Sequence, residues 1–277
     1  MKIRECEGMR QNDSYERGDG VVMFLDGHHI AAFCHFLMGA DTFEDDRSAF
    51  FVGYMYEFGL GVKQNYELAY EYFISCQDDD EGEAAYNLAI FHYFGLGADK
   101  DPRRALSYME KSAEMGCIEA QMYLAGVYLS GYLNPPSIFA VTLLPYHKAI
   151  DRPAVPLLMG DVREMARDPA YFVPVSETDA TRMLSLAAAQ DDAYAGRLLG
   201  DAKFLLAQAF LEGYAMESRG EGGTERDHEA FERLLLDAAV NDGSREAAAY
   251  IAAHRDEFQT PALCAYVRRL ALEEKKD

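Results

Sequence analysis

The sequence predicts an all-α fold, an α/α right-handed superhelical solenoid of stacked helical hairpins. Gly59, Gly95 and Gly131 recur at an interval of 36 residues, and a fixed period in this range is typical of solenoids. Apolar residues at helical spacing precede each glycine. A residue that can cap a helix follows each glycine six positions later. The repeating unit is therefore a pair of helices.

The first helix of each unit ends at the glycine. Aligned copies share an apolar position and, four residues later, a ring-bearing position, so both lie on one helical face; these pairs are Val52 and Tyr56, Leu88 and His92, and Leu124 and Tyr128. Glycine adopts at low cost the left-handed conformation in which many helices end. The turn of each hairpin therefore begins at this glycine.

The second helix begins at the capping residue. Asn65, Asp101 and Ser137 differ in chemistry, yet each side chain accepts hydrogen bonds from the free amides of a first helical turn. Pro102 follows Asp101 at a position where its missing N–H has no cost. Small and apolar residues then recur at helical spacing: Ala69, Phe73, Ala105, Met109 and Ala113.

We expect one elongated repeat domain over residues 1–277. Prolines at 135, 136 and 145 predict a bent third hairpin. Ser176 predicts a capped helix, and a long helix is expected over 193–213. The predicted parts are a degenerate leading half-repeat (1–47), repeats (48–83, 84–119 and 120–153), divergent repeats (154–191 and 192–244) and C-terminal capping helices (245–277).

The segments AQMYLAGVYLSG (120–131) and DPRRALSYMEKSAEMGCIEA (101–120) closely resemble the Sel-one-like repeat, a relative of the tetratricopeptide repeat. The GLG sequences at 59–61 and 95–97 match the inter-helix turn of that family. The resemblance is strong over 48–131. It implies a non-catalytic adaptor or scaffold that binds a peptide or helix of another protein in a concave groove lined by the first helices.

The resemblance also implies which side chains point into that groove. They are Tyr54, Glu57, Phe58, Tyr86, Ile90, Tyr93, Phe94 and Met122. Aromatic anchors with a few carboxylates suit a peptide with apolar and basic side chains. For Phe58 and Phe94, next to the turn glycine, an alternative stays open, in which they pack against the next hairpin.

A net charge of −21 argues against nucleic acid, because phosphate binding requires a basic surface. It favours a basic protein partner, although an acidic surface also serves solubility alone. The sequence has no apolar run long enough to span a membrane and no signal-peptide stretch at its start, so we expect a cytoplasmic protein. Its five scattered cysteines predict reduced thiols. The oligomeric state is open between monomer and dimer.

No motif predicts catalysis. The GLG turns lack the Lys-Ser/Thr of a phosphate loop, and the acidic run 78–83 lacks the spacing of a calcium loop. A cluster of His28, His29, Cys34 and His35 has no second matched cluster to complete a metal site. We therefore predict no catalytic residue, no metal and no cofactor. A hydrolase with its site in the groove and an acidic decoy that mimics nucleic acid remain as alternatives.

Overall fold

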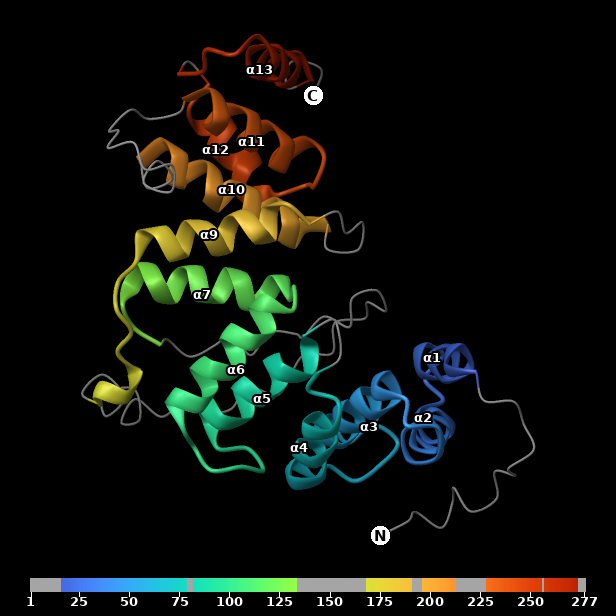
Figure 1. Cartoon of the computed structure of the whole chain (residues 1–277). Helices are drawn as coiled ribbons and strands as arrows, with labels where there is room; N and C mark the ends of the chain where they lie inside the picture. The colour runs from blue at the N-terminus through green and yellow to red at the C-terminus, as the bar shows by residue number, and fades with distance from the viewer. Residues whose placement is uncertain are drawn as a thin grey trace. The chain divides into compact units, whose positions relative to one another are not determined.

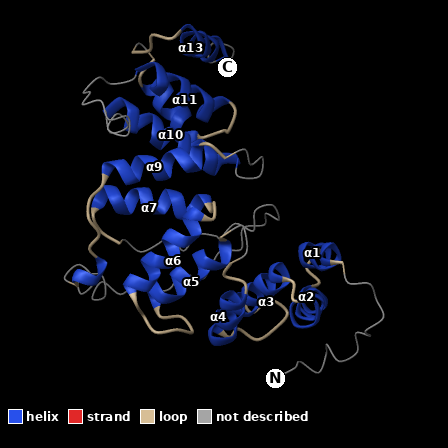
Figure 2. Ribbon diagram, viewed as in Figure 1, coloured by secondary structure: helices blue, strands red, loops and turns tan. Residues whose placement is uncertain are grey.

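The computed structural model describes residues 16–78, 82–133, 168–190, 196–212, 228–255 and 257–273. These residues form α-helices, one short 3-10 helix and a single isolated β-bridge between Tyr132 and Phe172 (Figures 1 and 2). The predicted all-α class is confirmed. Contacts divide the chain into two compact units: unit 1 (Met1–Cys117 and Leu133–Tyr171) and unit 2 (Ile118–Tyr132 and Phe172–Asp277).

The described part of unit 1 consists of helical hairpins. They are α1 (Arg17–Leu25) with α2 (His29–Phe43), α3 (Asp46–Phe58) with α4 (Tyr66–Ser75), and α5 (Glu83–Phe94) with α6 (Pro102–Glu114). Helix α2 also packs on α3, and α4 packs on α5. Residues 17–43 thus form a complete hairpin where the sequence predicts a half-repeat. Its short turn lacks the glycine-to-cap spacing of the other copies, which hides it from the pattern.

The predicted ends of these helices are confirmed. Gly59 and Gly95 take left-handed conformations with φ of 68° and 75°. The Asn65 side chain accepts a hydrogen bond from Leu68 N at 2.9 Å. Asp101 accepts hydrogen bonds from Arg103 N and Arg104 N. These bonds satisfy backbone amides that a helix leaves open in its first turn.

The second glycine of each GLG turn has a separate role. Gly61 and Gly97 both have positive φ, and each turn lies against the start of the preceding second helix. A Cβ on Gly61 would lie 2.4 Å from the His29 carbonyl, and one on Gly97 would lie 2.3 Å from the Tyr66 carbonyl oxygen. Only glycine permits this backbone approach, which sets the spacing between hairpins in unit 1.

Aromatic rings fill the core of unit 1 and link its hairpins. Phe36 of α2 stacks on Phe51 of α3, with ring centroids 4.3 Å apart. Phe73 of α4 contacts Phe50 of α3 at 5.8 Å and Phe91 of α5 at 5.6 Å. All five rings are completely or almost completely buried, so each hairpin completes the core of its neighbour.

Unit 2 contains α7 (Ile118–Ser130), α9 (Glu177–Ala188), α10 (Gly196–Glu212), α11 (His228–Val240), α12 (Arg245–Ala253) and α13 (Pro261–Glu273). Helix α9 lies between α7 and α10, and α10 packs on α11 (Figure 1). Helices α12 and α13 both contact α11. The long helix predicted over 193–213 is α10, and the capped helix predicted after Ser176 is α9.

Helix α9 is the second helix of the hairpin that α7 begins. Ser176 N donates to Tyr128 O at 3.0 Å, as Asn65 N does to Tyr56 O at 2.9 Å and Asp101 N to His92 O at 2.8 Å. Ser176 therefore takes the place predicted for Ser137, 39 positions earlier. The prediction that this hairpin closes within 120–153 is therefore wrong, because its second helix begins after Ser176. Residues 134–167, including Pro145, lie outside the described residues.

The prediction that all the cysteines are reduced is wrong. Cys34 on α2 is disulfide-bonded, whereas Cys76, Cys117 and Cys264 are free thiols. The expectation missed this bond because five scattered cysteines carry no pairing signal. Within the described ranges, no helix has both the length and the apolar character needed to cross a membrane.

Candidate functional site

The structure buries five of the eight side chains expected to line the groove. Tyr54, Tyr86 and Tyr93 are 2%, 4% and 1% exposed, and Glu57 and Ile90 are also buried. A partner does not reach a buried side chain without displacing its cover, so these five serve as core in this structure. The side chains that remain partly exposed are Phe58, Phe94 and Met122.

Tyr54 is buried because α1 covers it. Phe24 of α1 meets the Tyr54 ring edge-on at 6.3 Å, and Phe58 lies 4.5 Å from it, one helical turn further along α3. Phe24 is itself buried. The hairpin that the sequence pattern missed thus supplies the cover for the first predicted anchor.

Tyr93 is covered by a distant segment of the chain. The 3-10 helix η2 (Pro169–Tyr171) places the Tyr171 ring edge-on against Tyr93 at 5.8 Å. The Tyr93 hydroxyl donates to Leu133 O at 3.3 Å, and Lys100 Nζ lies 5.9 Å from the centre of the Tyr171 ring. Burial, and secondarily the charge of Asp168, raises the pKa of Tyr171. The chain therefore fills this part of the predicted groove itself.

Phe58 and Phe94 are equivalent residues, 36 positions apart and each directly before a capping glycine. Phe58 rests against Tyr54 at 4.5 Å, and Phe94 rests against Tyr93 at 4.9 Å. Each partly exposed phenyl ring thus contacts a buried tyrosine. Unit 1 presents two supported aromatic rings one repeat apart. We call Phe58 and Phe94 the phenylalanine pair.

Met122 lies in unit 2 and contributes mainly to packing. It contacts the buried cluster formed by Ile118, Ala187, Leu199 and Ala202. The thioether therefore fills space between α7, α9 and α10. The predicted anchors fall in two units, and the phenylalanine pair belongs wholly to unit 1.

The His and Cys side chains at the start of α2, for which the sequence predicts no metal site, have other contacts. His35 Nε2 is hydrogen-bonded to Glu16 O at 2.9 Å, whereas the His29 ring packs edge-on against Phe24 at 5.4 Å. Cys34 is bonded in its disulfide. The described residues bring together no group of three or more His, Cys, Asp and Glu side chains able to hold a metal ion.

His92 has a partner at each ring nitrogen. Nδ1 lies 3.1 Å from Asp99 O, and Nε2 lies 3.2 Å from the Tyr70 hydroxyl. The ring also stacks on Tyr108, with an interplanar angle of 7°. The carbonyl of Asp99 accepts only from an Nδ1–H, and in the neutral tautomer with that proton Nε2 accepts from Tyr70. Histidine therefore joins the α5–α6 turn to α4 in this repeat.

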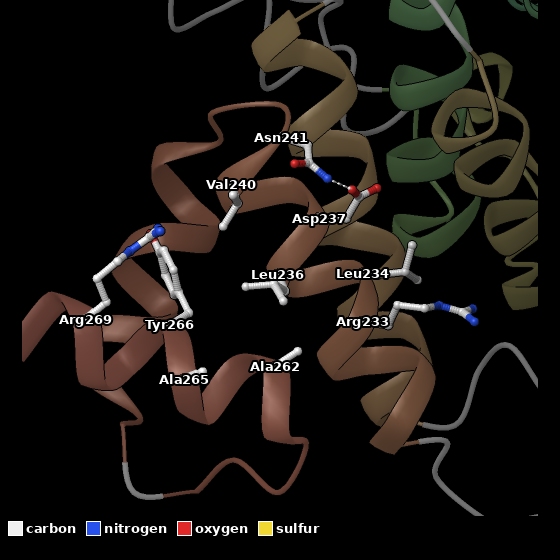
Figure 3. A pocket seen from close by; sticks show the side chains of 10 residues that line it. All are labelled: Arg233, Leu234, Leu236, Asp237, Val240, Asn241, Ala262, Ala265, Tyr266 and Arg269. Atoms are coloured by element: carbon white, nitrogen blue, oxygen red, sulfur yellow. Dashed lines mark hydrogen bonds between the residues drawn. The ribbon is translucent and has the colours of Figure 1, made fainter.

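Unit 2 has an open groove between α11 and α13, with a volume of about 740 Å³ (Figure 3). For this region the sequence pattern predicts only C-terminal capping helices. Its lining, which we call the α11–α13 groove, consists of Arg233, Leu234, Leu236, Asp237, Val240, Asn241, Ala262, Ala265, Tyr266 and Arg269. In Figure 3, Arg269 lies beside Tyr266 on one side of Leu236, and Arg233 lies on the other.

Partly buried polar contacts hold the helices around this groove in place. Glu232 on α11 accepts hydrogen bonds from Gln259 N at 2.7 Å and from Thr260 N at 2.6 Å, just before α13 begins. Lys203 of α10 lies 2.6 Å from Asp237 and 2.8 Å from Asp242. Burial opposes ionisation of Asp237, but its bonds to Lys203 and Asn241 hold its pKa below the usual value.

Comparisons with known proteins agree with the repeat pattern. A model of the Sel1 repeat matches residues 46–75 and 82–117. The fold is similar to that of a Sel1 repeat protein from Oxalobacter formigenes, with a TM-score of 0.55 and 18% identity over 81% of this chain and 49% of that one. The chain therefore spans about half the length of that protein. No curated protein matches the sequence.

A second solved structure is a protective antigen present in uropathogenic Escherichia coli strains that displays an SLR fold. Its TM-score is 0.45 and its identity 19%, over 95% of this chain and 61% of that one.

The matched segments coincide with observed hairpins. Residues 46–75 are α3 and α4 from end to end, and 82–117 enclose α5 and α6. The hairpin of α7 and α9 is not matched, in keeping with the insertion that separates its helices. Sel1-repeat proteins are generally protein-interaction scaffolds. The predicted resemblance is confirmed: this chain carries Sel1 repeats at residues 46–75 and 82–117.

Proposed function

We propose that this protein is a non-catalytic scaffold that binds a segment of a partner protein across the phenylalanine pair. The observation that carries the proposal is the repetition of one feature. Phe58 and Phe94 are partly exposed at equivalent positions of neighbouring Sel1 repeats. Each contacts a buried tyrosine, Tyr54 for Phe58 and Tyr93 for Phe94. Aromatic side chains held in place by packing lose little entropy on binding and often dominate interface energy.

The spacing suits an extended peptide or a helix. Phe58 ends α3 and Phe94 ends α5, and α4 packs on both helices, so a partner segment that contacts both rings crosses from one repeat to the next. The net charge of −21 favours a partner segment with basic side chains beside its apolar ones. Two of the buried members of the predicted set, Tyr54 and Tyr93, enter this proposal as supports for the phenyl rings.

Cytoplasmic location is the part of the expectation with the least support. It rested on the lack of an apolar run and of a signal-peptide stretch, whereas Cys34 is disulfide-bonded. Disulfides persist chiefly in oxidising compartments. The proposed binding requires the phenylalanine pair and the acidic surface, and it is compatible with either environment.

The test compares affinity capture by the wild type with capture by a Phe58→Ala/Phe94→Ala variant in lysate of the native cell, read by mass spectrometry. Phe43→Ala is the matched control, because Phe43 on α2 is also an exposed phenylalanine, at 53%. We expect wild type and control to retain the same specific partner and the double variant to lose it. Truncation of buried tyrosines is unsuitable here, because a core cavity costs about 3–5 kcal/mol.

Salt separates this proposal from the acidic-decoy alternative. Binding that resists moderate salt and requires both phenylalanines supports the scaffold. Capture of the same proteins by all variants, with loss of all of them at high salt, would overturn the role of the phenylalanine pair. That second result is what an acidic decoy with a basic partner predicts.

A further inference from the structure

We infer that the α11–α13 groove is a second protein-interaction site, which takes an amphipathic helix carrying acidic side chains. This surface lies in unit 2, whereas the phenylalanine pair lies in unit 1. Its proposed ligand also has the opposite charge. The inference is therefore independent of the function proposed above.

The lining has the spacing of two helical stripes. Ala262, Ala265, Tyr266 and Arg269 follow an i, i+3, i+4, i+7 pattern on α13, and Arg233, Leu236, Asp237 and Val240 follow the same pattern on α11. Such stripes run along their helices, so the groove extends along two turns of each wall. A third helix with its own apolar stripe fits a groove of this form.

The walls of the α11–α13 groove keep apolar side chains partly exposed. Leu263, on another side of α13, is fully buried with Phe231 and Leu235 of α11. The groove side instead has Val240 at 45% exposure, with Leu236 and Tyr266 partly exposed. Ala262 and Ala265 are exposed and small, so they let an incoming backbone approach α13 closely.

The charge of the groove identifies the chemistry of its ligand. Arg233 and Arg269 are both exposed, and neither forms an ion pair with any described residue. Arg269 lies over the Tyr266 ring at 5.3 Å, which holds its guanidinium beside the groove. The acidic lining residue, Asp237, is already paired with Lys203 at 2.6 Å.

The groove is therefore locally basic on a chain of net charge −21. Carboxylates flanking an apolar stripe complement two arginines that flank apolar side chains. A basic helix would meet unpaired arginines here and would lose affinity from like-charge repulsion.

The test uses two labelled probe peptides and the full chain, with binding read by fluorescence anisotropy at low and at moderate salt. Both peptides are amphipathic helices of about five turns with leucines at i, i+3, i+4 and i+7. One carries glutamates beside the leucines, and the other carries lysines at the same positions. We expect the wild type to bind the glutamate peptide at least about tenfold more tightly than the lysine peptide.

Variants of exposed residues keep the test independent of folding. Arg233→Glu/Arg269→Glu is expected to reverse the preference between the two peptides, and Ala265→Trp, which fills the groove, is expected to abolish binding of both. Arg268→Glu is the matched control, because Arg268 is exposed on α13 and does not line the groove. Arg268→Glu should keep the preference of the wild type, and its affinity for each peptide should change by less than about threefold.

Three results would overturn the inference. One is equal affinity of the wild type for both peptides. Another is that Arg233→Glu/Arg269→Glu has the same preference between the peptides as Arg268→Glu. The third is concentration-dependent self-association in sedimentation that Ala265→Trp abolishes, which would assign the groove to a second copy of the chain.

Discussion

Arg47 of α3 and Glu83 of α5 form a buried ion pair, with the guanidinium Nη1 donating to the carboxylate. The two residues are 36 positions apart, so they occupy the same place in successive repeats. Arg47 also lies over the Phe50 ring at 4.9 Å. The stacking of these two hairpins therefore includes a specific polar contact in addition to apolar burial.

Removal of one partner of this pair should destabilise unit 1 strongly. Arg47→Met leaves the Glu83 carboxylate buried beside apolar groups, and we expect a loss of about 3–5 kcal/mol in the free energy of unfolding. Arg47→Met/Glu83→Gln should recover about half of that loss, because no buried charge remains. Urea unfolding followed by circular dichroism measures both. The single variant Glu83→Gln completes the comparison. If the double variant loses as much free energy of unfolding as Arg47→Met and Glu83→Gln lose together, the two residues are not coupled.

The two glycines of one GLG turn should differ in their tolerance of alanine. At Gly59 a Cβ meets its nearest neighbours at 3.4 Å, so Gly59→Ala should cost only the left-handed backbone, about 1–2 kcal/mol. At Gly61 the added Cβ lies 2.4 Å from the His29 backbone, so Gly61→Ala should cost at least about 2 kcal/mol more, through displacement of α2. Thermal unfolding of both variants gives the comparison. Equal losses of stability in the two variants would mean that the close approach of Gly61 to the α2 backbone does not contribute to stability.

Stability should fall as the pH rises above about 10. Burial, then the negative charge of Asp41, raises the pKa of Tyr72 well above its ordinary value, and burial likewise raises the pKa of Tyr56 and Tyr250. The unfolded chain releases these protons at lower pH than the folded one. The stability that they contribute is therefore complete below about pH 10 and is lost above it.

The variant Tyr72→Phe isolates one of these groups. It removes the titrating hydroxyl and the hydrogen bond to Asp41 at 3.3 Å. We expect a small loss at neutral pH and a shallower decline above about pH 10 than in the wild type. Urea unfolding at a series of pH values measures this difference. Parallel profiles for the two proteins would show that Tyr72 has an ordinary pKa.

Thiol labelling should distinguish the free cysteines by burial. Cys264 is partly exposed, whereas Cys76 and Cys117 are buried. With an alkylating reagent and no reductant, we expect Cys264 to be modified first and the other two only when the chain opens. Cys34 should remain unmodified until a reductant is added. Peptide mapping by mass spectrometry assigns each site, and rapid labelling of Cys76 in the native protein would contradict its burial next to α4.

The 36-residue repeat could be predicted from the sequence, because the residues that end and begin its helices act locally. Gly95 and Asp101 lie within one turn of the helices that they end and begin, and their conformations depend on a few neighbouring atoms. The same signals failed for the hairpin of α7 and α9. Ser137 and Ser176 are equally good caps in isolation, and only the bond from Ser176 N to Tyr128 O decides between them.

The accessibility of the predicted anchors depended on tertiary structure. Tyr54 and Tyr93 have the spacing expected of a groove, but Phe24 and Tyr171 cover them, and Tyr171 is 78 residues away in the chain. The α11–α13 groove likewise exists only once α11 and α13 pack together, because each helix supplies one of its walls.

The sequence by itself determined the helical hairpin, its turn glycines and its caps, because backbone conformation within one repeat is set by short-range sterics and hydrogen bonds. Tertiary structure decided which helix closes the third hairpin, which aromatic rings are covered and where an apolar groove stays open. Those outcomes depend on contacts between residues far apart in the chain, and no periodic pattern encodes such contacts.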